Sequence, residues 1–173
     1  MFNGSKLKLA VSTGLTVAGI GLSALAAVPA AAATTTATAS VSNVLTLSGL
    51  TAAFTLTGAP ATTQTGLSAV SMNVKSNNRT GYNVTVQAAA ASMAGATTGN
   101  SDTIPIADLT VRNTTTGGAY TALSSSAAAT VANTTAKSAS TGDTVNNDFQ
   151  MVIPWVNSDS YSVTLNYIAA NNP

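Results

Sequence analysis

Alternation of apolar and polar residues is the feature that most restricts the fold of this chain. Between residues 161 and 169, Tyr, Val, Leu, Tyr and Ala occupy the odd positions, and Ser162, Thr164 and Asn166 lie between them. Successive side chains of a β-strand point to opposite faces, so this period of two predicts a half-buried strand. No stretch of residues 34–173 carries a convincing period of 3.6 residues. The pattern therefore favours sheets over helices.

Further strand-like segments recur along the chain, separated by clusters of Gly, Asn and Ser. They are residues 41–47, 53–57, 70–74, 82–88, 104–112, 119–123 and 149–155, with a weaker candidate around Val131. A polar turn rich in Asn, ending in Gly, joins 70–74 to 82–88, a pattern that predicts a β-hairpin. Together the segments predict an all-β fold, an antiparallel immunoglobulin-like β-sandwich of about eight strands.

The first 33 residues have the pattern of a secretory signal peptide. Lys6 and Lys8 give a positive start, residues 9–28 are uncharged and largely apolar, and Pro29 precedes a run of Ala. We expect a signal helix that is cleaved between Ala33 and Thr34, leaving residues 34–173 as a single secreted domain. The alternative is an uncleaved membrane anchor, because residues 9–28 are about long enough to span a bilayer. Such an anchor would be the chain's one expected contact with a membrane.

Composition argues against several classes of function. Residues 34–173 hold four Lys or Arg against five Asp, and the chain contains no Cys, His or Glu. Without a basic face to neutralise phosphates, no nucleic-acid partner is expected. Without His or Glu to activate the many Ser and Thr hydroxyls, no enzyme is expected either. The clusters of Asp and Asn lack calcium-loop spacing and are attributed to turns, so the sequence predicts no metal and no cofactor.

Three aromatic residues are candidates for contact with a sugar. Trp155 is the only tryptophan, and an exposed tryptophan can stack on a sugar ring, with Tyr82 or Tyr120 assisting. The alternative is that Trp155 anchors the core or fills its rim.

Asp159 and Tyr161 match a second pattern, the tyrosine corner of immunoglobulin-like folds, in which a tyrosine hydroxyl bonds back to the backbone. A plain core tyrosine is the alternative. If Tyr161 begins the penultimate strand, the chain ends before a last strand can form, and an open edge could accept the extended 34–42 segment of a neighbour. Alternatively, the N-terminal segment closes its own sheet, or the strand order differs.

Two segments resemble the WxL-type surface domains of Gram-positive bacteria. Residues 74–86 are similar to that family's polar turn, glycine, aromatic residue and alternating strand, and residues 149–173 resemble its closing strand and terminus. The Trp-x-Leu signatures are missing, with Tyr167-Ile168-Ala169 where the second would fall. The resemblance implies a secreted β-sandwich that attaches non-covalently to peptidoglycan.

The expected function is that of a non-enzymatic, secreted structural or adhesive protein at the cell surface. Its expected partners are cell-wall polysaccharide, peptidoglycan or other surface proteins. One alternative is a self-assembling fibre or biofilm-matrix subunit that binds other copies of itself by strand donation. Another is a carbohydrate-binding module.

Overall fold

The computed structural model describes residues 33–173, which form an all-β structure with 44% of residues in strands and 2% helical. The predicted signal helix lies outside the described residues. Ala33 and Thr34 lie in an exposed stretch without secondary structure. No helix within residues 33–173 is long and apolar enough to cross a membrane.

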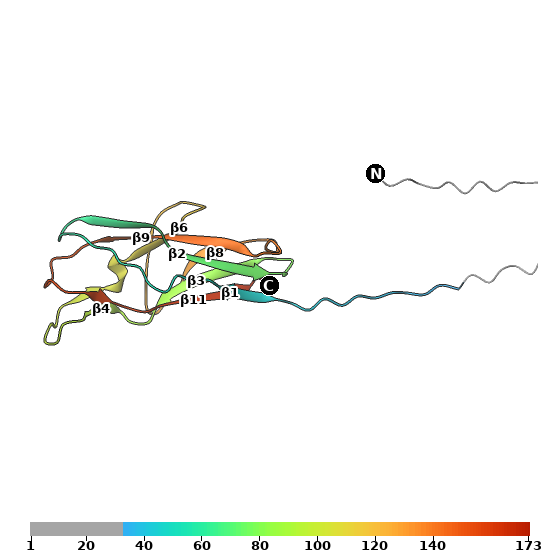
Figure 1. Ribbon diagram of the computed structural model, residues 1–173, viewed down its shortest axis with the longest axis horizontal. Helices are drawn as coiled ribbons and strands as arrows, with labels where there is room; N and C mark the ends of the chain where they lie inside the picture. Colours follow the sequence, from blue (N-terminus) through green and yellow to red (C-terminus); the bar gives the residue numbers. More distant parts are fainter. Residues whose placement is uncertain (1–32) are drawn as a thin grey trace, which may run out of the picture. The chain divides into compact units, whose positions relative to one another are not determined.

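Eleven antiparallel strands and one short 3-10 turn make up the described chain. They are β1 (Leu45–Ser48), β2 (Thr63–Ser76), β3 (Tyr82–Ala88), β4 (Ser92–Gly95), β5 (Thr103–Pro105), η1 (Ile106–Asp108), β6 (Thr110–Asn113), β7 (Thr121–Ala122), β8 (Ala129–Asn133), β9 (Asp143–Val152), β10 (Tyr161–Ser162) and β11 (Leu165–Asn171). The first sheet has the order β1-β2-β9-β6-β7, the second β11-β3-β8, and a small third sheet β10-β4-β5 (Figure 1).

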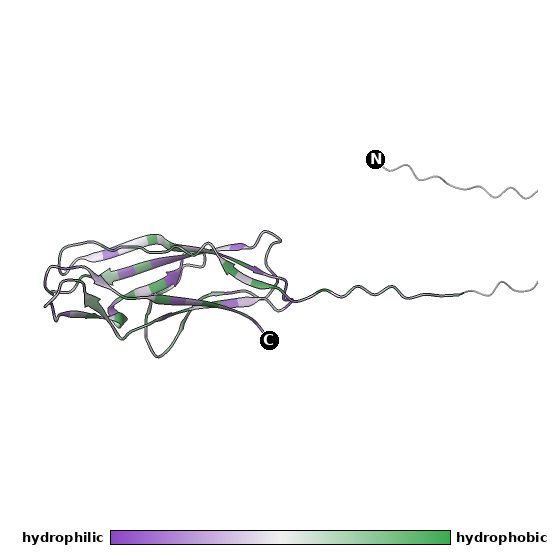
Figure 2. Cartoon of the chain, turned by 60° about the horizontal axis from the view of Figure 1, so that its bottom comes forward, coloured by the Kyte–Doolittle hydropathy of each residue, from purple (hydrophilic) through white to green (hydrophobic). Residues whose placement is uncertain are grey.

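One hydrophobic core unites these sheets in a β-sandwich-like arrangement. It takes every second residue of the long strands, among them Val70, Met72 and Val74 of β2 and Tyr82, Val84 and Val86 of β3. Hydropathy colouring makes the alternation along the strands visible (Figure 2). Phe149 of β9 is fully buried and packs on Phe54, with ring centroids 4.4 Å apart. Burial of each large apolar side chain contributes about 1.5–3 kcal/mol, and the sequence has no cysteine to add a disulfide.

The predicted hairpin between residues 70–74 and 82–88 is wrong. β2 pairs with β1 and β9, whereas β3 pairs with β11 and β8, so the two strands belong to different sheets. The turn between them crosses from one layer to the other and is held at Asn78, whose side-chain amide donates to the carbonyl oxygens of Gly81 and Asn172. The apolar faces of β2 and β3 therefore meet across the core, and the two strands do not lie side by side in one sheet.

Several predicted strands have different bounds in the structure. Of residues 41–47 only the end lies in β1, and residues 53–57 form no strand. The 104–112 segment is interrupted by η1 after Pro105, and 161–169 divides between β10 and β11, which belong to different sheets. The weak candidate around Val131 is confirmed as β8, with Val131 only 2% exposed.

Candidate functional site

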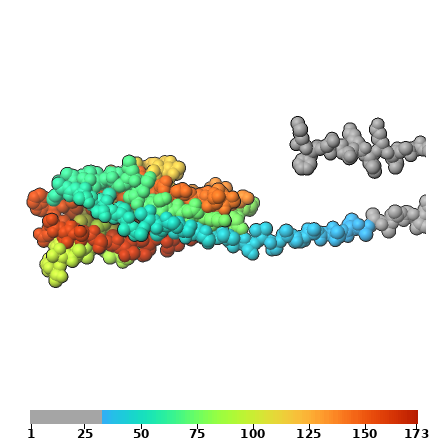
Figure 3. Space-filling model, in the orientation of Figure 1, coloured from blue at the N-terminus to red at the C-terminus, as the bar shows by residue number. Residues whose placement is uncertain are grey.

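An apolar groove opens between residues 50–58 and the C-terminal segment 161–167. Its volume is about 800 Å³. Buried core side chains line it, including Met93, Ile104 and Leu109, and Phe54 and Leu165 contribute from its two sides. In the space-filling view the cyan segment that contains residue 50 lies beside the red C-terminal segment (Figure 3). The groove therefore brings part of the hydrophobic core close to the surface.

β11 forms one rim of the groove and is an edge strand. Thr164 accepts a backbone hydrogen bond from Ala89, and Asn172 donates one to Gly81, both on the β3 side. Backbone groups of an antiparallel strand point alternately to its two sides. The N–H and C=O groups of Leu165, Tyr167 and Ala169 therefore point away from β3. In the described part of the chain, no strand pairs with β11 on that side.

Residues 52–58 form the other rim and lie alongside the sandwich without joining a ladder. The preceding Thr51 donates its N–H to Ser71 of β2 at 2.9 Å. Within residues 33–173, no backbone hydrogen bond involves residues 52–58. Phe54 and Leu56 are half-buried against the core, while the other residues of the 52–58 segment are exposed. Both rims thus carry peptide groups that an added strand could use.

Tyr167 places a buried hydroxyl at the groove. Its side chain lines the groove from β11, and its hydroxyl oxygen has no hydrogen-bond partner among the described residues. Burial raises the pKa of this hydroxyl well above its usual range. A buried hydroxyl without a hydrogen-bond partner is costly, so a ligand that accepts a hydrogen bond from it would relieve that cost.

Asp159 lies at the polar end of the groove and organises the chain before β10. It accepts hydrogen bonds from the Asn100 amide, the Thr97 N–H and hydroxyl, and the Ser160 N–H. The bonds from Asn100 and then from Thr97 hold the pKa of this carboxyl well below its usual range. The hydroxyl of Tyr161 donates to the carbonyl oxygen of Asn157, four residues upstream, at 2.9 Å. This is the contact that a tyrosine corner makes, although Tyr161 is half-buried.

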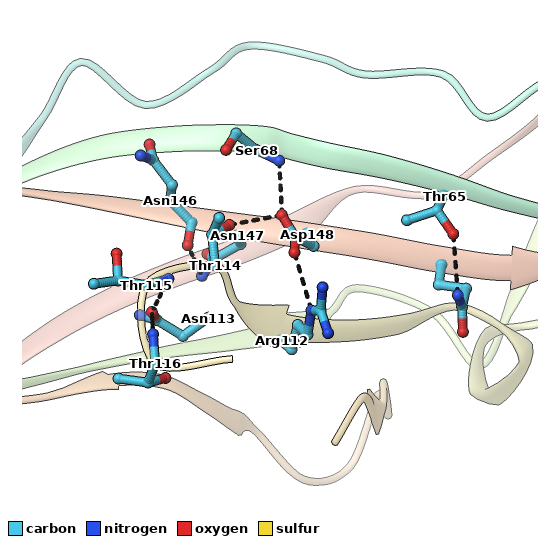
Figure 4. A network of polar contacts seen from close by, with 11 residues as sticks. Thr65, Ser68, Arg112, Asn113, Thr114, Thr115, Thr116, Asn146, Asn147 and Asp148 are labelled. Carbon is cyan, nitrogen blue, oxygen red and sulfur yellow. Dashed lines mark hydrogen bonds and ion pairs between the residues drawn. The ribbon is translucent and has the colours of Figure 1, made fainter. Parts of the chain in front are cut away.

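Asp148 on β9 is the centre of a second polar network, on sheet β1-β2-β9-β6-β7 (Figure 4). Its carboxylate is 1% exposed and accepts hydrogen bonds from Ser68 N–H at 2.8 Å, Thr114 hydroxyl at 2.7 Å and Arg112 Nε at 3.0 Å. Ser68 has a φ of 48° and sits in a bulge of β2, where the register against β9 shifts between Gly66 and Val70.

The environment of Asp148 fixes its charge. Burial acts to raise the pKa of this carboxyl, but the bonds from Ser68, Thr114 and Arg112 outweigh burial and hold the pKa below its usual value. All three donors come from this chain, so the carboxylate has no free role as an acid or a base. It fastens the bulge of β2 to β6 and is a structural group.

The three predicted sugar-contact residues are not brought together as a platform. Trp155 is 90% exposed, so the expected alternative of a core tryptophan is wrong. Tyr82 is 1% exposed and its hydroxyl donates to Asp143 at 2.9 Å, so it cannot offer a ring face to a sugar. Tyr120 is half-buried, with the Arg112 guanidinium 4.6 Å from its ring centroid. Only Trp155 offers a freely accessible ring.

The Asp and Asn clusters are used within the domain. Asp143 accepts from the Tyr82 hydroxyl and the Ala139 N–H, and Asp102 accepts from the Asn157 N–H. Residues 33–173 contain no group of three or more His, Cys, Asp or Glu side chains placed to hold a metal ion.

Sequence reasoning missed the groove and the Asp148 network. A signal for the network existed, since Arg112 ends the candidate strand 104–112, Asp148 directly precedes the candidate strand 149–155, and their charges are opposite. Their pairing across β6 and β9 could not be read without the strand order. Comparison of the chain with protein-family models and with curated proteins finds no match.

Proposed function

We propose that this chain is a secreted, non-enzymatic structural or adhesive protein of the cell envelope, built on an immunoglobulin-like β-sandwich. The order β1-β2-β9-β6 supports the immunoglobulin-like part, because it corresponds to strands A, B, E and D of that fold. β3 and β11, paired in the other sheet, then correspond to C and F. β8 departs from the pattern, since it lies beside β3 but follows β6 in the chain.

The observation that carries the proposal is an apolar groove with unpaired peptide edges, on a domain in which most carboxylates are hydrogen-bonded to the chain itself. Four of the five Asp side chains accept hydrogen bonds from the chain itself: Asp102, Asp143, Asp148 and Asp159. Surfaces of this kind suit binding and assembly better than reaction. The N-terminal signal-peptide pattern and the resemblance to WxL-type domains favour an envelope location.

Cell fractionation and sedimentation with purified peptidoglycan test the proposal. The full chain, expressed in a Gram-positive host, should be processed near Ala33 and recovered in the wall fraction. The purified 34–173 product should sediment with peptidoglycan, while an unrelated β-sandwich of similar size stays in solution. Retention in the cytosol, or a product that stays in solution with the control, would reject the envelope function.

Carbohydrate binding through Trp155 is a second candidate, favoured by the 90% exposure of this side chain. Exposed tryptophan is an effective stacking surface for a flat apolar ligand face. Trp155→Ala should then abolish retention on wall polysaccharide, whereas Ile168→Ala, at another exposed hydrophobic position (59% exposed), should not. Unchanged retention of Trp155→Ala would remove this candidate.

A further inference from the structure

We infer that the groove between residues 50–58 and β11 receives residues 34–42 of a second copy of this chain. The inference rests on the proposed structural function and names the partner of that same site. Each copy would then present a groove at one place and a donor segment at another, so that copies join head to tail.

The vacant position beside β11 is where such a fold adds its last strand. In the immunoglobulin-like assignment β11 is strand F, and strand G pairs with F on the side away from C. Within residues 33–173 no strand occupies that position. The outward peptide groups of Leu165, Tyr167 and Ala169 therefore have no strand partner in the described part of the chain. An inserted strand would pair with them on one side and lie against residues 52–58 on the other.

Residues 34–42 have the pattern that such a groove requires. Ala37, Ala39 and Val41 occupy one parity, and Thr36, Thr38, Ser40 and Ser42 occupy the other. In an extended conformation the apolar side chains would enter the groove and the hydroxyls would face water. The segment carries no charge, so its burial leaves no charge unpaired. All nine residues are exposed in this structure, with Val41 at 82%.

The length of the segment also fits. Nine residues in a strand span about 30 Å, and the seven residues of β11 span about 23 Å.

The segment does not fill the groove of its own copy in this structure. All nine of its residues are exposed, and its last residue is fixed where the Asn77 amide donates to the Ser42 carbonyl and the Val44 N–H donates to the Asn77 side chain, both at 2.8 Å. Asn43, the next residue, accepts a hydrogen bond from the Asn171 amide at the end of β11. A segment that folded back onto its own β11 would give a monomer, whereas a segment that enters a second copy gives oligomers, so the oligomeric state distinguishes the two.

Donation of this kind makes a heterologous contact, because the donor segment and the groove are different surfaces. Repetition of a heterologous contact gives an open filament unless the rotation closes a ring. We therefore expect oligomers of no fixed size.

The test uses the chain from Thr34 to Pro173 and two matched variants. Ala39→Arg places a charge on the parity that enters the groove, and Thr38→Arg places the same charge on the parity that faces water. Light scattering after size-exclusion chromatography should show oligomers that grow with concentration for the wild type and for Thr38→Arg. It should show a monomer for Ala39→Arg. Circular dichroism should show a folded β-sheet domain for all three, because residue 39 lies outside the strands of the domain.

A peptide of residues 34–42 tests the groove directly. The Ala39→Arg monomer retains an intact groove, so the wild-type peptide should bind it and shift the emission of Trp155, the only tryptophan, whose neighbours Pro154 and Val156 line the groove. Excess peptide should also shorten wild-type oligomers. The same peptide with Ala39→Arg should do neither.

Three results would overturn the inference: a monomeric wild type, equal assembly of the two variants, or a peptide that fails to bind the Ala39→Arg monomer. The envelope function is judged separately by sedimentation with peptidoglycan. A monomer that sediments would refute strand donation alone, and an oligomer that never reaches the envelope would refute the proposed function alone.

Discussion

Replacement of Asp148 by Ala should be one of the most destabilising single changes on the sheet surface. The side chain lies on the outer parity of β9, opposite Phe149, yet it is only 1% exposed. It fastens three separate segments, through Ser68 in the bulge of β2, Arg112 on β6 and Thr114 just after β6.

The magnitude follows from these three bonds. A hydrogen bond to a charged group contributes about 1.5–3 kcal/mol, so three such bonds give roughly 4.5 kcal/mol at the lower limit. Ser68 is an exposed residue and the Arg112 side chain is 31% exposed, so water can replace part of what is lost. If water restores about a third of the lost hydrogen-bond energy, the free energy of unfolding falls by about 3 kcal/mol. For a domain of this size that loss corresponds to a fall in Tm of roughly 10 °C.

Urea unfolding followed by circular dichroism measures this loss. Asp148→Ala should lower the midpoint without changing the slope, because the surface exposed on unfolding is the same. The control is Asp108→Ala, at an exposed aspartate in η1, which should change stability by less than about 0.5 kcal/mol. Equal small effects in both variants would refute the conclusion that Asp148 holds the bulge.

Three further outcomes are expected. Gly81→Ala should lower the free energy of unfolding by about 3 kcal/mol, because φ is 85° and an added Cβ would meet the backbone carbonyl of Thr134. Gly117→Ala, where φ is 63° and the space around the residue is open, should lower it by about 1 kcal/mol. Equal urea midpoints for the two variants would contradict this expectation. Folding lowers the pKa values of Asp148 and Asp159, so the stability that these carboxylates add is complete above about pH 3.9 and is lost as the pH falls further. When the pH is lowered past about 4, Tm should therefore decrease. The decrease should be less steep in a variant with both residues replaced by Asn. Trp155→Ala should change the unfolding free energy by less than about 0.5 kcal/mol, and a larger loss in urea would mean that this ring packs against the domain.

Alternation located the main strands because it reports which face of a strand is buried. Val70, Met72 and Val74 recur on one parity, and all three are buried in the core. The same pattern does not report which strand lies alongside. A hairpin and a crossing between layers both place Val84 inward, so the choice between them depends on contacts with distant residues such as Ala169.

Two other features depended on chain geometry that local patterns do not carry. Trp155 follows the parity of Phe149 and Met151, but β9 ends at Val152, just before Pro154, which has no N–H to donate to a ladder. Beyond that point parity no longer decides burial, and the ring lies in water. Asp148 falls on a polar parity and would be expected outside, yet Ser68, 80 residues away in the chain, covers it.

The crossing of the chain between layers after β2 has a consequence for how quickly the protein matures. A hairpin at that point would have given a local nucleus, since its strands are neighbours in the sequence. Instead β2 must find β9, and β3 must find β11, across loops of some eighty residues, as in the pairs Val70–Asn147 and Val84–Ala169. Proteins dominated by such distant pairings fold in milliseconds to seconds. In the secreted protein that we propose, the long strands would remain unpaired during that interval, and the sparse charge of this sequence would do little to keep such chains apart.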